Sequence, residues 1–384
     1  MWWIFSSIAA LYLFSAGFAL FHSRWARRLP ALGTLPATPG NGDSPEPRCS
    51  VVIAARDEAA RIEATVQRVL GQRGIAIELI VVDDRSTDGT GDIVRRLAAA
   101  DARVQVKRVD TLPDGWLGKC HACHVGASAA TGDWILFTDA DCWLKPDVVA
   151  RALRVAGRDG VEHITLTPGV APETLGAQAW HLAFLLSLTN WLSAVNRDRT
   201  GAYLGMGAFN LVRAAAYREC GGYETLRLTV LDDVRLGLLL RRAGKRTRGF
   251  IGGDDVECHW GTTVPGMIRI MEKNYFAAVD YRVTAALTCG VGGLLTWGLA
   301  VVGPFTGTPA GMAAGGALLS VMVPSGVLAR RLGWPWRGAV FTPFVYPALF
   351  YAVLNSTFVT LGRGGIRWRD TFYPLKTLRA GNVR

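Results

Sequence analysis

The sequence has no regular cysteine framework. Its cysteines number seven, which is odd, and their spacing is irregular. They stand at Cys49, Cys120, Cys123, Cys142, Cys220, Cys258 and Cys289. This pattern argues against a disulfide-stapled secreted domain and is typical of a chain in a reducing compartment.

The sequence also lacks a nucleic-acid-binding motif, although its formal net charge is +11. Because it shows no run of alternating basic and aromatic residues, we expect no nucleic-acid partner. Many of the basic residues instead flank long apolar runs. Since basic flanks contact anionic lipid headgroups, the charge favours a membrane as the partner.

Charged side chains are missing from the start of the chain, where residues 1–22 contain no Lys, Arg, Asp or Glu. Residues 1–23 are therefore expected to form a transmembrane anchor. Arg24, Arg27 and Arg28 follow this run, whereas a cleaved signal peptide carries its positive charge before the apolar run. The positive-inside rule then predicts an N-terminus outside the cell and a following domain at the cytoplasmic face of the cell (inner) membrane.

Three further apolar runs are each long enough to cross a bilayer. They cover residues 283–304, 309–329 and 338–361, within a predicted membrane region at 283–361. If all three cross, the basic tail at 362–384 lies outside, against the positive-inside rule. The last run also contains Pro343, Pro347 and Asn355. Two interpretations stay open: a full third span, and a re-entrant or broken hairpin that returns the tail to the cytoplasm.

The middle of the chain has the pattern of an α/β domain. Residues 24–48 are rich in proline and glycine and are expected to form a linker. Over residues 49–282, short apolar strands alternate with helical patterns, which predicts a parallel sheet. Within this domain, residues 178–195 are apolar but interrupted by polar side chains, which favours an amphipathic helix at the membrane interface.

Carboxylates follow two of the predicted strands. Asp83 and Asp84 end one strand, and Asp139 and Asp141 end the apolar run Trp134 to Thr138. Ligands of a parallel sheet bind beyond the carboxyl ends of its strands, so these side chains are expected at one edge. Paired carboxylates suit Mg²⁺ or Mn²⁺ that also binds substrate phosphates. Asp-x-Asp alone, however, is equally typical of a solvated turn.

Five short motifs in a fixed order give the chain its resemblance to a known family. The motifs are Ser50 to Glu58, Val82 to Thr90, Gly118-Lys119, Thr138 to Asp141, and Leu231-Asp232-Asp233. In this order they resemble the family 2 glycosyltransferases of the nucleotide-diphospho-sugar (GT-A) fold, over roughly residues 49–282. The layout of anchor, central domain and apolar C-terminal segments looks most like the hopene-associated and carotenoid-type members, with ceramide-glucosyltransferase-like enzymes also in the group.

The resemblance implies a role for each matching residue. It implies that the nucleotide pocket is lined by Ala55, Arg56 and Glu58, that Asp83 or Asp84 binds the uracil base, and that Lys119 reaches the nucleotide or its diphosphate. It also implies that Asp139 faces the ribose and the metal and that Asp141 is the main metal ligand. The general base would be Asp233, beside Asp232. The simpler interpretations are a helix N-cap for Asp232-Asp233 and a solvated surface lysine for Lys119.

The chemistry agrees with these roles. Departure of a nucleoside diphosphate builds negative charge on phosphate, which a bound Mg²⁺ or Mn²⁺ stabilises. On the opposite side of the sugar, a carboxylate accepts the proton of the attacking hydroxyl. Such a single displacement inverts the anomeric centre. We therefore expect inverting, metal-dependent transfer of one sugar from a nucleotide-sugar, a UDP-sugar, to a lipid hydroxyl at the cytoplasmic membrane face.

Two alternatives come from other features. A processive polysaccharide synthase would carry a Gln-x-x-Arg-Trp signature, but the corresponding region reads Met271 to Phe276, where Lys273 and Asn274 either replace the signature or mark a helix surface. A non-catalytic scaffold or a haem protein would use Cys120-His121-Ala122-Cys123-His124, which satisfies the Cys-x-x-Cys-His haem-attachment pattern. Covalent haem is attached outside the cytoplasm, so we expect no haem there.

Overall fold

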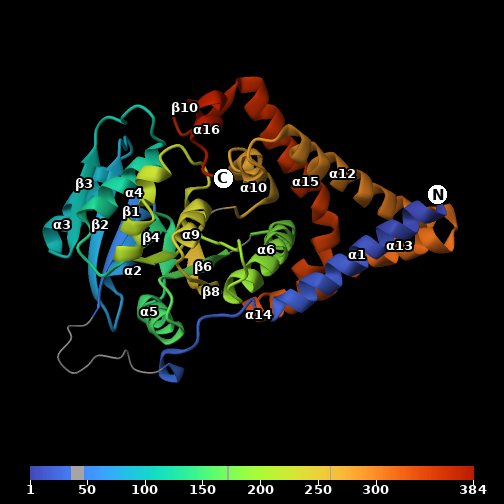
Figure 1. Ribbon diagram of the computed structural model, residues 1–384, viewed down its shortest axis with the longest axis horizontal. Helices are drawn as coiled ribbons and strands as arrows, with labels where there is room; N and C mark the ends of the chain where they lie inside the picture. Colours follow the sequence, from blue (N-terminus) through green and yellow to red (C-terminus); the bar gives the residue numbers. More distant parts are fainter. Residues whose placement is uncertain (36–46, 171–172, 260) are drawn as a thin grey trace. The chain divides into compact units, whose positions relative to one another are not determined.

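The structure is a computed structural model that describes residues 1–35, 47–170, 173–259 and 261–384. It divides into two compact units. The α/β unit comprises Arg27–Gly169, Ala194–His259 and Gly381–Arg384, and the helical unit comprises Met1–Ala26, Val170–Ser193 and Trp260–Ala380. Figure 1 shows the sheet of the α/β unit and the long helices of the helical unit, and the two are described separately below.

Among the described residues, eight strands form the sheet of the α/β unit, in the order β3-β2-β1-β4-β7-β6-β8-β5. They are β1 (Arg48–Ala55), β2 (Ala76–Asp84), β3 (Val104–Val109), β4 (Trp134–Asp139), β5 (Cys142–Leu144), β6 (His163–Val170), β7 (Asn210–Arg213) and β8 (Thr247–Cys258). The pairs among β1, β2, β3 and β4 are parallel, whereas β7 pairs antiparallel with β4 and β6, and β5 with β8. The expected α/β architecture is therefore present, with a mixed sheet in place of a purely parallel one.

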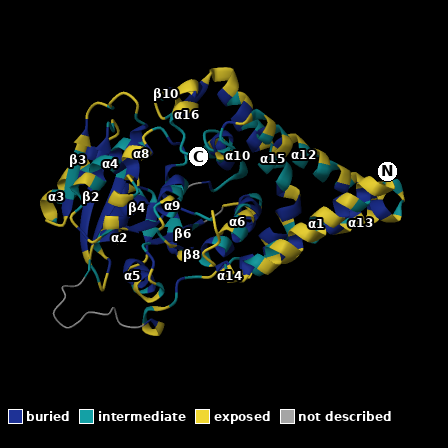
Figure 2. Cartoon of the chain, viewed as in Figure 1, coloured by how far each residue is buried: buried dark blue, intermediate teal, exposed yellow. Residues whose placement is uncertain are grey.

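The register of the parallel strands brings their carboxyl ends together. Ala55 of β1 is paired with Asp83 of β2, and Ala54 is paired with Asp139 of β4. Val51, Val52 and Ile53 are almost fully buried, as the sheet strands in Figure 2 show, because helices cover both faces of a parallel sheet. The strand that precedes Asp139 is thus fixed by core packing.

The helices of this unit are α2 (Ile62–Leu70), α3 (Thr90–Ala100), α4 (Gly118–Ala129), α5 (Val148–Asp159), α7 (Ala214–Glu219), α8 (Gly222–Thr225) and α9 (Asp232–Arg242). The first begins at Ile62, four residues after Glu58. The backbone N–H of Glu58 donates instead to Thr90 Oγ1 at 2.8 Å, and that of Ala59 to Asp88 Oδ2 at 2.9 Å. These bonds hold the loop after β1 against the loop after β2 and delay the helix.

Residues 27–35, in the segment expected to be a linker, are packed on the sheet edge. Arg28 forms a β-bridge with Ile251 of β8. The Arg151 side chain of α5 donates to the carbonyl oxygens of Leu29 and Pro30 at 2.8 and 2.9 Å. It also pairs with Asp255 at 2.8 Å, and both side chains are buried. Residues 36–46 of that segment lie outside the described residues.

Replacing Arg151 removes one partner of this buried ion pair. We expect Arg151→Met to lower the free energy of unfolding by about 3 kcal/mol or more, because Asp255 is left as an uncompensated buried charge. The thermal midpoint of the purified full chain in detergent measures the effect. The control Arg158→Met breaks an exposed pair with Asp159 and is expected to change stability by less than about 0.5 kcal/mol. An equal midpoint for both variants would contradict the structural role of Arg151.

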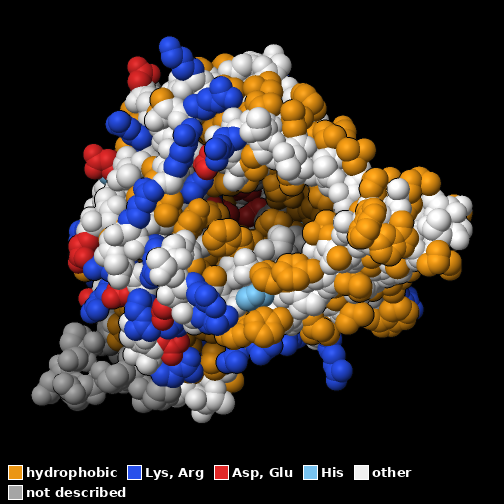
Figure 3. Space-filling view, turned by 45° about the vertical axis from the view of Figure 1, so that its right-hand side comes forward, with side chains coloured by type: hydrophobic (Ala, Val, Ile, Leu, Met, Phe, Trp, Pro, Cys, Tyr) orange, Lys and Arg blue, Asp and Glu red, His pale blue; other side chains and the backbone are white. Residues whose placement is uncertain are grey.

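The helical unit contains α1 (Trp2–Ser23), most of α6 (Leu175–Asn196), α10 (Val264–Met271), α11 (Tyr275–Ala278), α12 (Val283–Val302), η2 (Gly303–Thr306), α13 (Pro309–Leu319), α14 (Met322–Leu332), α15 (Arg337–Arg363), β9 (Gly365–Trp368), β10 (Thr371–Pro374) and α16 (Leu375–Gly381). Within the described ranges, four helical segments are long and apolar enough to cross a membrane: Trp2–Ser23, Val283–Thr306, Pro309–Leu332 and Arg337–Arg363. On the face that Figure 3 shows, many hydrophobic side chains gather over the long helices.

The structure of the last apolar run, residues 338–361, contradicts one of the two interpretations of its sequence. Residues 337–363 form one continuous helix that passes through Pro343 and Pro347. A hairpin broken within this run is therefore wrong. The carbonyl oxygen of Pro343 accepts a hydrogen bond from Trp297 Nε1 of α12 at 2.8 Å, so a neighbouring helix compensates part of the backbone bonding that prolines disturb.

Candidate active site

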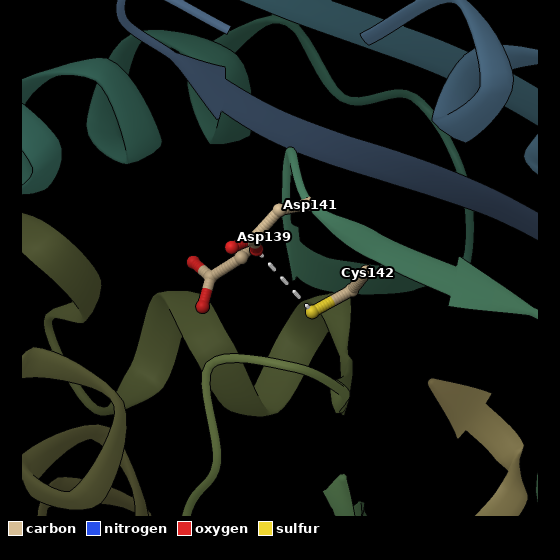
Figure 4. A group of neighbouring side chains, drawn as sticks. All are labelled: Asp139, Asp141 and Cys142. Atoms are coloured by element: carbon tan, nitrogen blue, oxygen red, sulfur yellow. Dashed lines mark hydrogen bonds between the residues drawn. The ribbon is translucent and has the colours of Figure 1, made fainter. Parts of the chain in front are cut away.

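Two carboxylates lie where β4 ends. Asp139 is the last residue of β4, and Asp141 precedes β5. Figure 4 shows both beside Cys142, and the ligand atoms of these three residues lie within 4.8 Å of one another. Burial and the neighbouring charge of Asp139 raise the pKa of Asp141. A divalent cation would relieve both effects, and carboxylate oxygens are the ligands that Mg²⁺ and Mn²⁺ prefer.

Lys119 connects these carboxylates with those of α9. It stands at the start of α4, and its Nζ lies 2.7 Å from Asp139 Oδ1 and 3.9 Å from Asp232 Oδ2. Although burial opposes the charged form, the carboxylates of Asp139, Asp232 and Asp233 hold the pKa of Lys119 well above its ordinary value. The ammonium group therefore stays charged, and Lys119 is no solvated surface lysine.

Asp233 lies at the start of α9, in the first turn of the helix. Its Oδ2 accepts the backbone N–H of Gly207 at 2.7 Å, and its Oδ1 accepts that of Val234 at 2.8 Å. These two bonds cap the helix and fix the orientation of the Asp233 carboxylate. A fixed orientation is what a proton acceptor needs. The helix-capping interpretation and the catalytic one are thus compatible.

Asp232 is buried beside Asp233 and has a different environment. The Tyr223 hydroxyl donates to Asp232 Oδ2 at 3.0 Å. Because Asp232 is only 3% exposed and lies on the Lys119 side, it is suited to hold Lys119 and less suited to meet an acceptor. The geometry therefore favours different roles for the two neighbouring carboxylates: Asp232 holds Lys119, and Asp233 is left to meet an acceptor.

Three contributors to the site were not assigned a role from the sequence. Cys142 joins the carboxylates at β4, Tyr223 holds Asp232, and Gly207 holds Asp233. The run Gly205-Met206-Gly207 is a visible signal, since paired glycines mark close backbone approach. A Cβ on Gly207 would stand 2.7 Å from Asp139 Oδ2 and 3.2 Å from Lys119 Nζ.

We expect Gly207→Ala to reduce turnover by about tenfold or more, because a misplacement of about 1 Å in such a site costs up to about a hundredfold. The added methyl group would push Asp139 or Lys119 from its position. Gly157→Ala on α5 is the matched control, since a Cβ there meets no atom within 4 Å. Initial rates of sugar transfer are compared at equal amounts of folded protein. Equal rates in the two variants would show that the contact at Gly207 is not needed.

The two carboxylates at the end of β2, Asp83 and Asp84, have different hydrogen-bond partners. Arg85 donates to both oxygens of Asp84, at 2.7 and 3.0 Å. Asp83 Oδ1 accepts the Ser86 N–H at 3.2 Å, while its buried Oδ2 has no hydrogen bond and lies 3.6 Å from Arg108 Nη1. Both carboxylates are therefore buried and held beside basic side chains, Asp84 by Arg85 and Asp83 by Arg108.

The residues after β1 lie on the neighbouring strand end. Ala55 is paired with Asp83. Arg56 and Glu58 follow in the loop that the bonds to Asp88 and Thr90 hold in place. This arrangement places the three residues expected to line a nucleotide pocket beside the base-binding candidate.

The Cys-x-x-Cys-His segment does not offer a haem site. Cys120 and Cys123 lie on α4 and are buried, and Cys120 Sγ donates to the Thr229 carbonyl oxygen at 3.5 Å. Burial raises the pKa of both thiols. His121 and His124 are packed on the Trp116 ring. A thioether bond to haem needs accessible thiols, so the segment is part of the packing around α4.

Lys273 and Asn274, the candidates for the missing signature, belong to the helical unit. Lys273 Nζ lies 3.9 Å from the centroid of the Trp368 ring and donates to Asn274 Oδ1 at 3.0 Å. These contacts bind Lys273 to the chain's own C-terminal hairpin. Its role toward a diphosphate stays a prediction.

Comparisons with known proteins agree with the fold. Residues 50–221 match the family described as glycosyl transferase family 2. The chain is 26% identical over 207 residues to a 4,4'-diaponeurosporenoate glycosyltransferase of Staphylococcus haemolyticus, covering 50% of this chain and 51% of that protein. It is 26% identical over 194 residues to a Staphylococcus aureus protein of the same name, covering 49% and 50%. The chain thus spans about half the length of the curated relatives it matches.

A solved structure shows the same fold. The mannosyltransferase PcManGT from Pyrobaculum calidifontis, in complex with GDP-Man and Mn²⁺, matches with a TM-score of 0.54 and 18% identity. The match covers 92% of this chain and 99% of that one. The similarity is one of fold, the GT-A arrangement of a curled mixed sheet with helices on both faces.

Proposed function

We propose that the protein transfers one sugar from a nucleoside-diphosphate sugar to a hydroxyl group of an apolar lipid, because residues 50–221 match glycosyl transferase family 2 and the chain shares its fold with a solved mannosyltransferase. The proposal includes inversion of the anomeric centre, dependence on Mg²⁺ or Mn²⁺, and action at the cytoplasmic face of the membrane. One observation carries it: Lys119 lies between Asp139 of β4 and Asp232 of α9, with Asp233 next in the chain.

The donor is held, in this proposal, by residues at the carboxyl ends of β1, β2 and β4. Asp83 or Asp84, at the end of β2, accepts an N–H of the base. The Lys119 ammonium group turns from Asp139 toward the diphosphate, because the diphosphate is also an anionic hydrogen-bond acceptor. The sugar then lies between this edge of the sheet and the start of α9.

Asp233 is the proposed proton acceptor. Its carboxylate is held by Gly207 and Val234 and so presents a fixed lone pair to the acceptor hydroxyl. As the hydroxyl oxygen forms its bond to the anomeric carbon, Asp233 takes the proton and the nucleoside diphosphate leaves from the opposite face. One displacement of this kind inverts the configuration.

Asp139 and Asp141 fit a divalent metal ion, since both are carboxylates at one strand end and Asp141 is buried against a like charge. Cys142 Sγ lies 3.7 Å from Asp141 Oδ1, which makes the thiol a further candidate ligand. When bound, Mg²⁺ or Mn²⁺ supplies stabilisation of the charge that develops on the leaving diphosphate.

The membrane-length helices support the lipid acceptor. A catalytic domain joined to such helices meets molecules dissolved in the bilayer at high local concentration. The curated relatives are named 4,4'-diaponeurosporenoate glycosyltransferase, a name that denotes a carboxylate. Arg24, Arg27 and Arg28 after α1 favour a cytoplasmic position for the domain that follows.

A donor and acceptor screen tests the proposal. The full chain in bacterial lipid extract is incubated with Mn²⁺ and a panel of UDP-sugars and GDP-mannose, and release of the nucleotide is measured with and without lipid. Lipid-stimulated UDP release with one sugar added to a lipid supports the proposal. Release from GDP-mannose alone would replace the UDP donor, and a ladder of products in the mass spectrum would favour a processive synthase. No release with any donor from folded protein would overturn the proposal.

A further inference from the structure

We propose that His163 and Asn210 are positioning residues for Asp233, because they form a buried chain of hydrogen bonds that holds the backbone of this residue at the start of α9. The inference rests on the proposed function, since it concerns the residue that takes the proton in that reaction. Neither side chain is exposed to solvent, so both act through the Asp233 carbonyl oxygen. All three residues belong to the α/β unit.

The chain of hydrogen bonds begins on three neighbouring strands of the sheet. Asn210 is the first residue of β7, His163 the first of β6 and Thr247 the first of β8, and these strands are adjacent in the order β7-β6-β8. His163 is paired with Val212, and Thr165 with Asn210, so His163 and Asn210 are diagonal neighbours on one face. His163 Nε2 lies 2.5 Å from Asn210 Oδ1, and its Nδ1 lies 3.0 Å from Thr247 Oγ1.

Asn210 connects this pair with α9. Its Nδ2 donates to the backbone carbonyl oxygen of Asp233 at 3.3 Å. The 205–207 turn lies against the same group, since a Cβ on Gly205 would overlap the Asp233 carbonyl oxygen and stand 3.2 Å from Asn210 Nδ2. The Asp233 carboxylate accepts the Gly207 N–H at 2.7 Å. Asp233 is therefore held twice, by its backbone through Asn210 and by its side chain through Gly207.

The direction of each hydrogen bond follows from the Asp233 carbonyl oxygen. Because this oxygen only accepts, the amide nitrogen of Asn210 faces it, and the amide oxygen faces His163. The amide oxygen also only accepts, so Nε2 of His163 carries a proton. Burial lowers the pKa of His163 to about 4, which leaves the ring neutral at pH 7 and Nδ1 free to accept from the Thr247 hydroxyl. A network with one assignment for every member fixes one geometry.

A role in packing alone is the alternative explanation for these side chains. His163 and Asn210 are fully buried, and a buried polar group costs free energy unless it is hydrogen-bonded. Apolar side chains at both positions would fill space between the strands without that cost. They would not supply a donor to the Asp233 carbonyl oxygen, whose position determines where the carboxylate lies. The end of the network on the second residue of α9 therefore favours the positioning role.

Matched variants of His163 separate the two roles. His163→Phe keeps a ring but removes the donor to Asn210, whereas His163→Gln keeps an amide N–H that reaches the same oxygen. Ser50→Ala is the control for general destabilisation, because Ser50 Oγ donates to Glu78 in another buried network near the start of β1. The full chains are purified in detergent and compared below their thermal midpoints. Should His163→Phe fail to fold, Thr247→Val, which removes only the hydroxyl that orients the ring, is measured in its place with the same expected direction.

Hydrogen–deuterium exchange at the Gly207 N–H tests the geometry without any substrate. Because the Asp233 carboxylate accepts this N–H, it is protected only while the carboxylate stays in place. We expect His163→Phe to speed exchange at Gly207 by about tenfold, and His163→Gln and Ser50→Ala to keep the wild-type rate there. Mass spectrometry with electron-transfer fragmentation measures these rates. Unchanged exchange in His163→Phe would overturn the inference, whatever the activity of the protein.

Steady-state kinetics of sugar transfer gives the second readout. We expect His163→Phe to lower kcat by about tenfold or more, because a misplacement of about 1 Å costs up to about a hundredfold. The KM for the nucleotide-sugar should stay unchanged, since the proposed donor contacts lie at the ends of β1, β2 and β4. His163→Gln should recover most of the loss, and Ser50→Ala should keep the wild-type kcat.

The outcomes distinguish this inference from the proposed function. A wild-type kcat in His163→Phe, or an equal loss of kcat in Ser50→Ala, would overturn the positioning role while transfer by the wild type still supports the proposed function. If the wild type transfers no sugar from any donor, the proposed function fails. Exchange at Gly207 then still decides whether His163 and Asn210 hold Asp233 in place.

Discussion

Asp233→Asn is expected to lower kcat for sugar transfer by about 10²–10⁴-fold while the KM for the nucleotide-sugar changes little. The substitution keeps the shape of the side chain but leaves one acceptor oxygen and a neutral amide in place of the charged base. Asp233 stands at the start of α9 and makes no ion pair with Lys119, whereas Asp139 does, so donor contacts at the sheet edge are expected to persist. Steady-state rates over a range of donor concentrations separate the two parameters.

The control for this variant is Asp92→Asn, which neutralises an exposed carboxylate on α3 that pairs with Arg95. It is expected to leave both parameters unchanged. Full activity of Asp233→Asn with a hydroxyl acceptor would show that another group takes the proton. A carboxylate acceptor carries no proton to remove, so Asp233→Asn should lose activity with a lipid alcohol and keep it with a lipid carboxylate.

The sequence predicts those site residues that directly follow a strand, because a strand is recognised from consecutive residues. Trp134 to Thr138 has the composition of a buried strand, and its register with β1 brings Asp139 beside Ala54, as the pattern predicts. The same holds for Asp83 at the end of β2. Local composition determines a strand and its end, and parallel pairing then aligns these ends.

Contacts between distant segments could not be predicted in this way. Gly207 meets Asp233 and Asp139 across the site, and Tyr223 meets Asp232, although none of these pairs shares a local pattern. Lys119 is equally consistent with a surface position until the three carboxylates around it are placed. Such contacts depend on how α4, α9 and the 205–207 turn pack, which periodicity does not encode.

The last apolar run shows the same limit in the helical unit. Hydropathy predicts residues 338–361 as a membrane segment, and the structure has one continuous helix there. Whether that helix crosses depends on contacts at its ends, such as those of Ser356 with Glu272, which lie far apart in the sequence. The excess of arginine in the tail predicts a cytoplasmic position for it, which a count of three C-terminal spans does not give.

The second large effect is expected for Asp141→Asn, which should reduce transfer by about a hundredfold or more. Removing this carboxylate weakens the hold on the divalent ion, whose charge stabilisation is worth several kcal/mol. Burial and the charge of Asp139 raise the pKa of Asp141, so the unliganded protein loses a repulsive contact when the charge is removed. We therefore expect the thermal midpoint without metal to stay equal or rise while activity falls. Thermal unfolding of the purified full chain and transfer rates measure the two effects.

Metal linkage separates this explanation from general damage to the site. Ligand that binds only the folded state raises the thermal midpoint with its concentration. Mn²⁺ with UDP should thus raise the midpoint of the wild type and of the control Asp254→Asn, an exposed carboxylate on β8, but not that of Asp141→Asn. An Asp141→Asn variant that keeps the full Mn²⁺-dependent rise would show that the ion is held elsewhere.

Because Lys119 lies 2.7 Å from Asp139, the ammonium group and the ion compete for one carboxylate. Lys119→Met should therefore bind Mn²⁺ alone more tightly while it loses affinity for UDP.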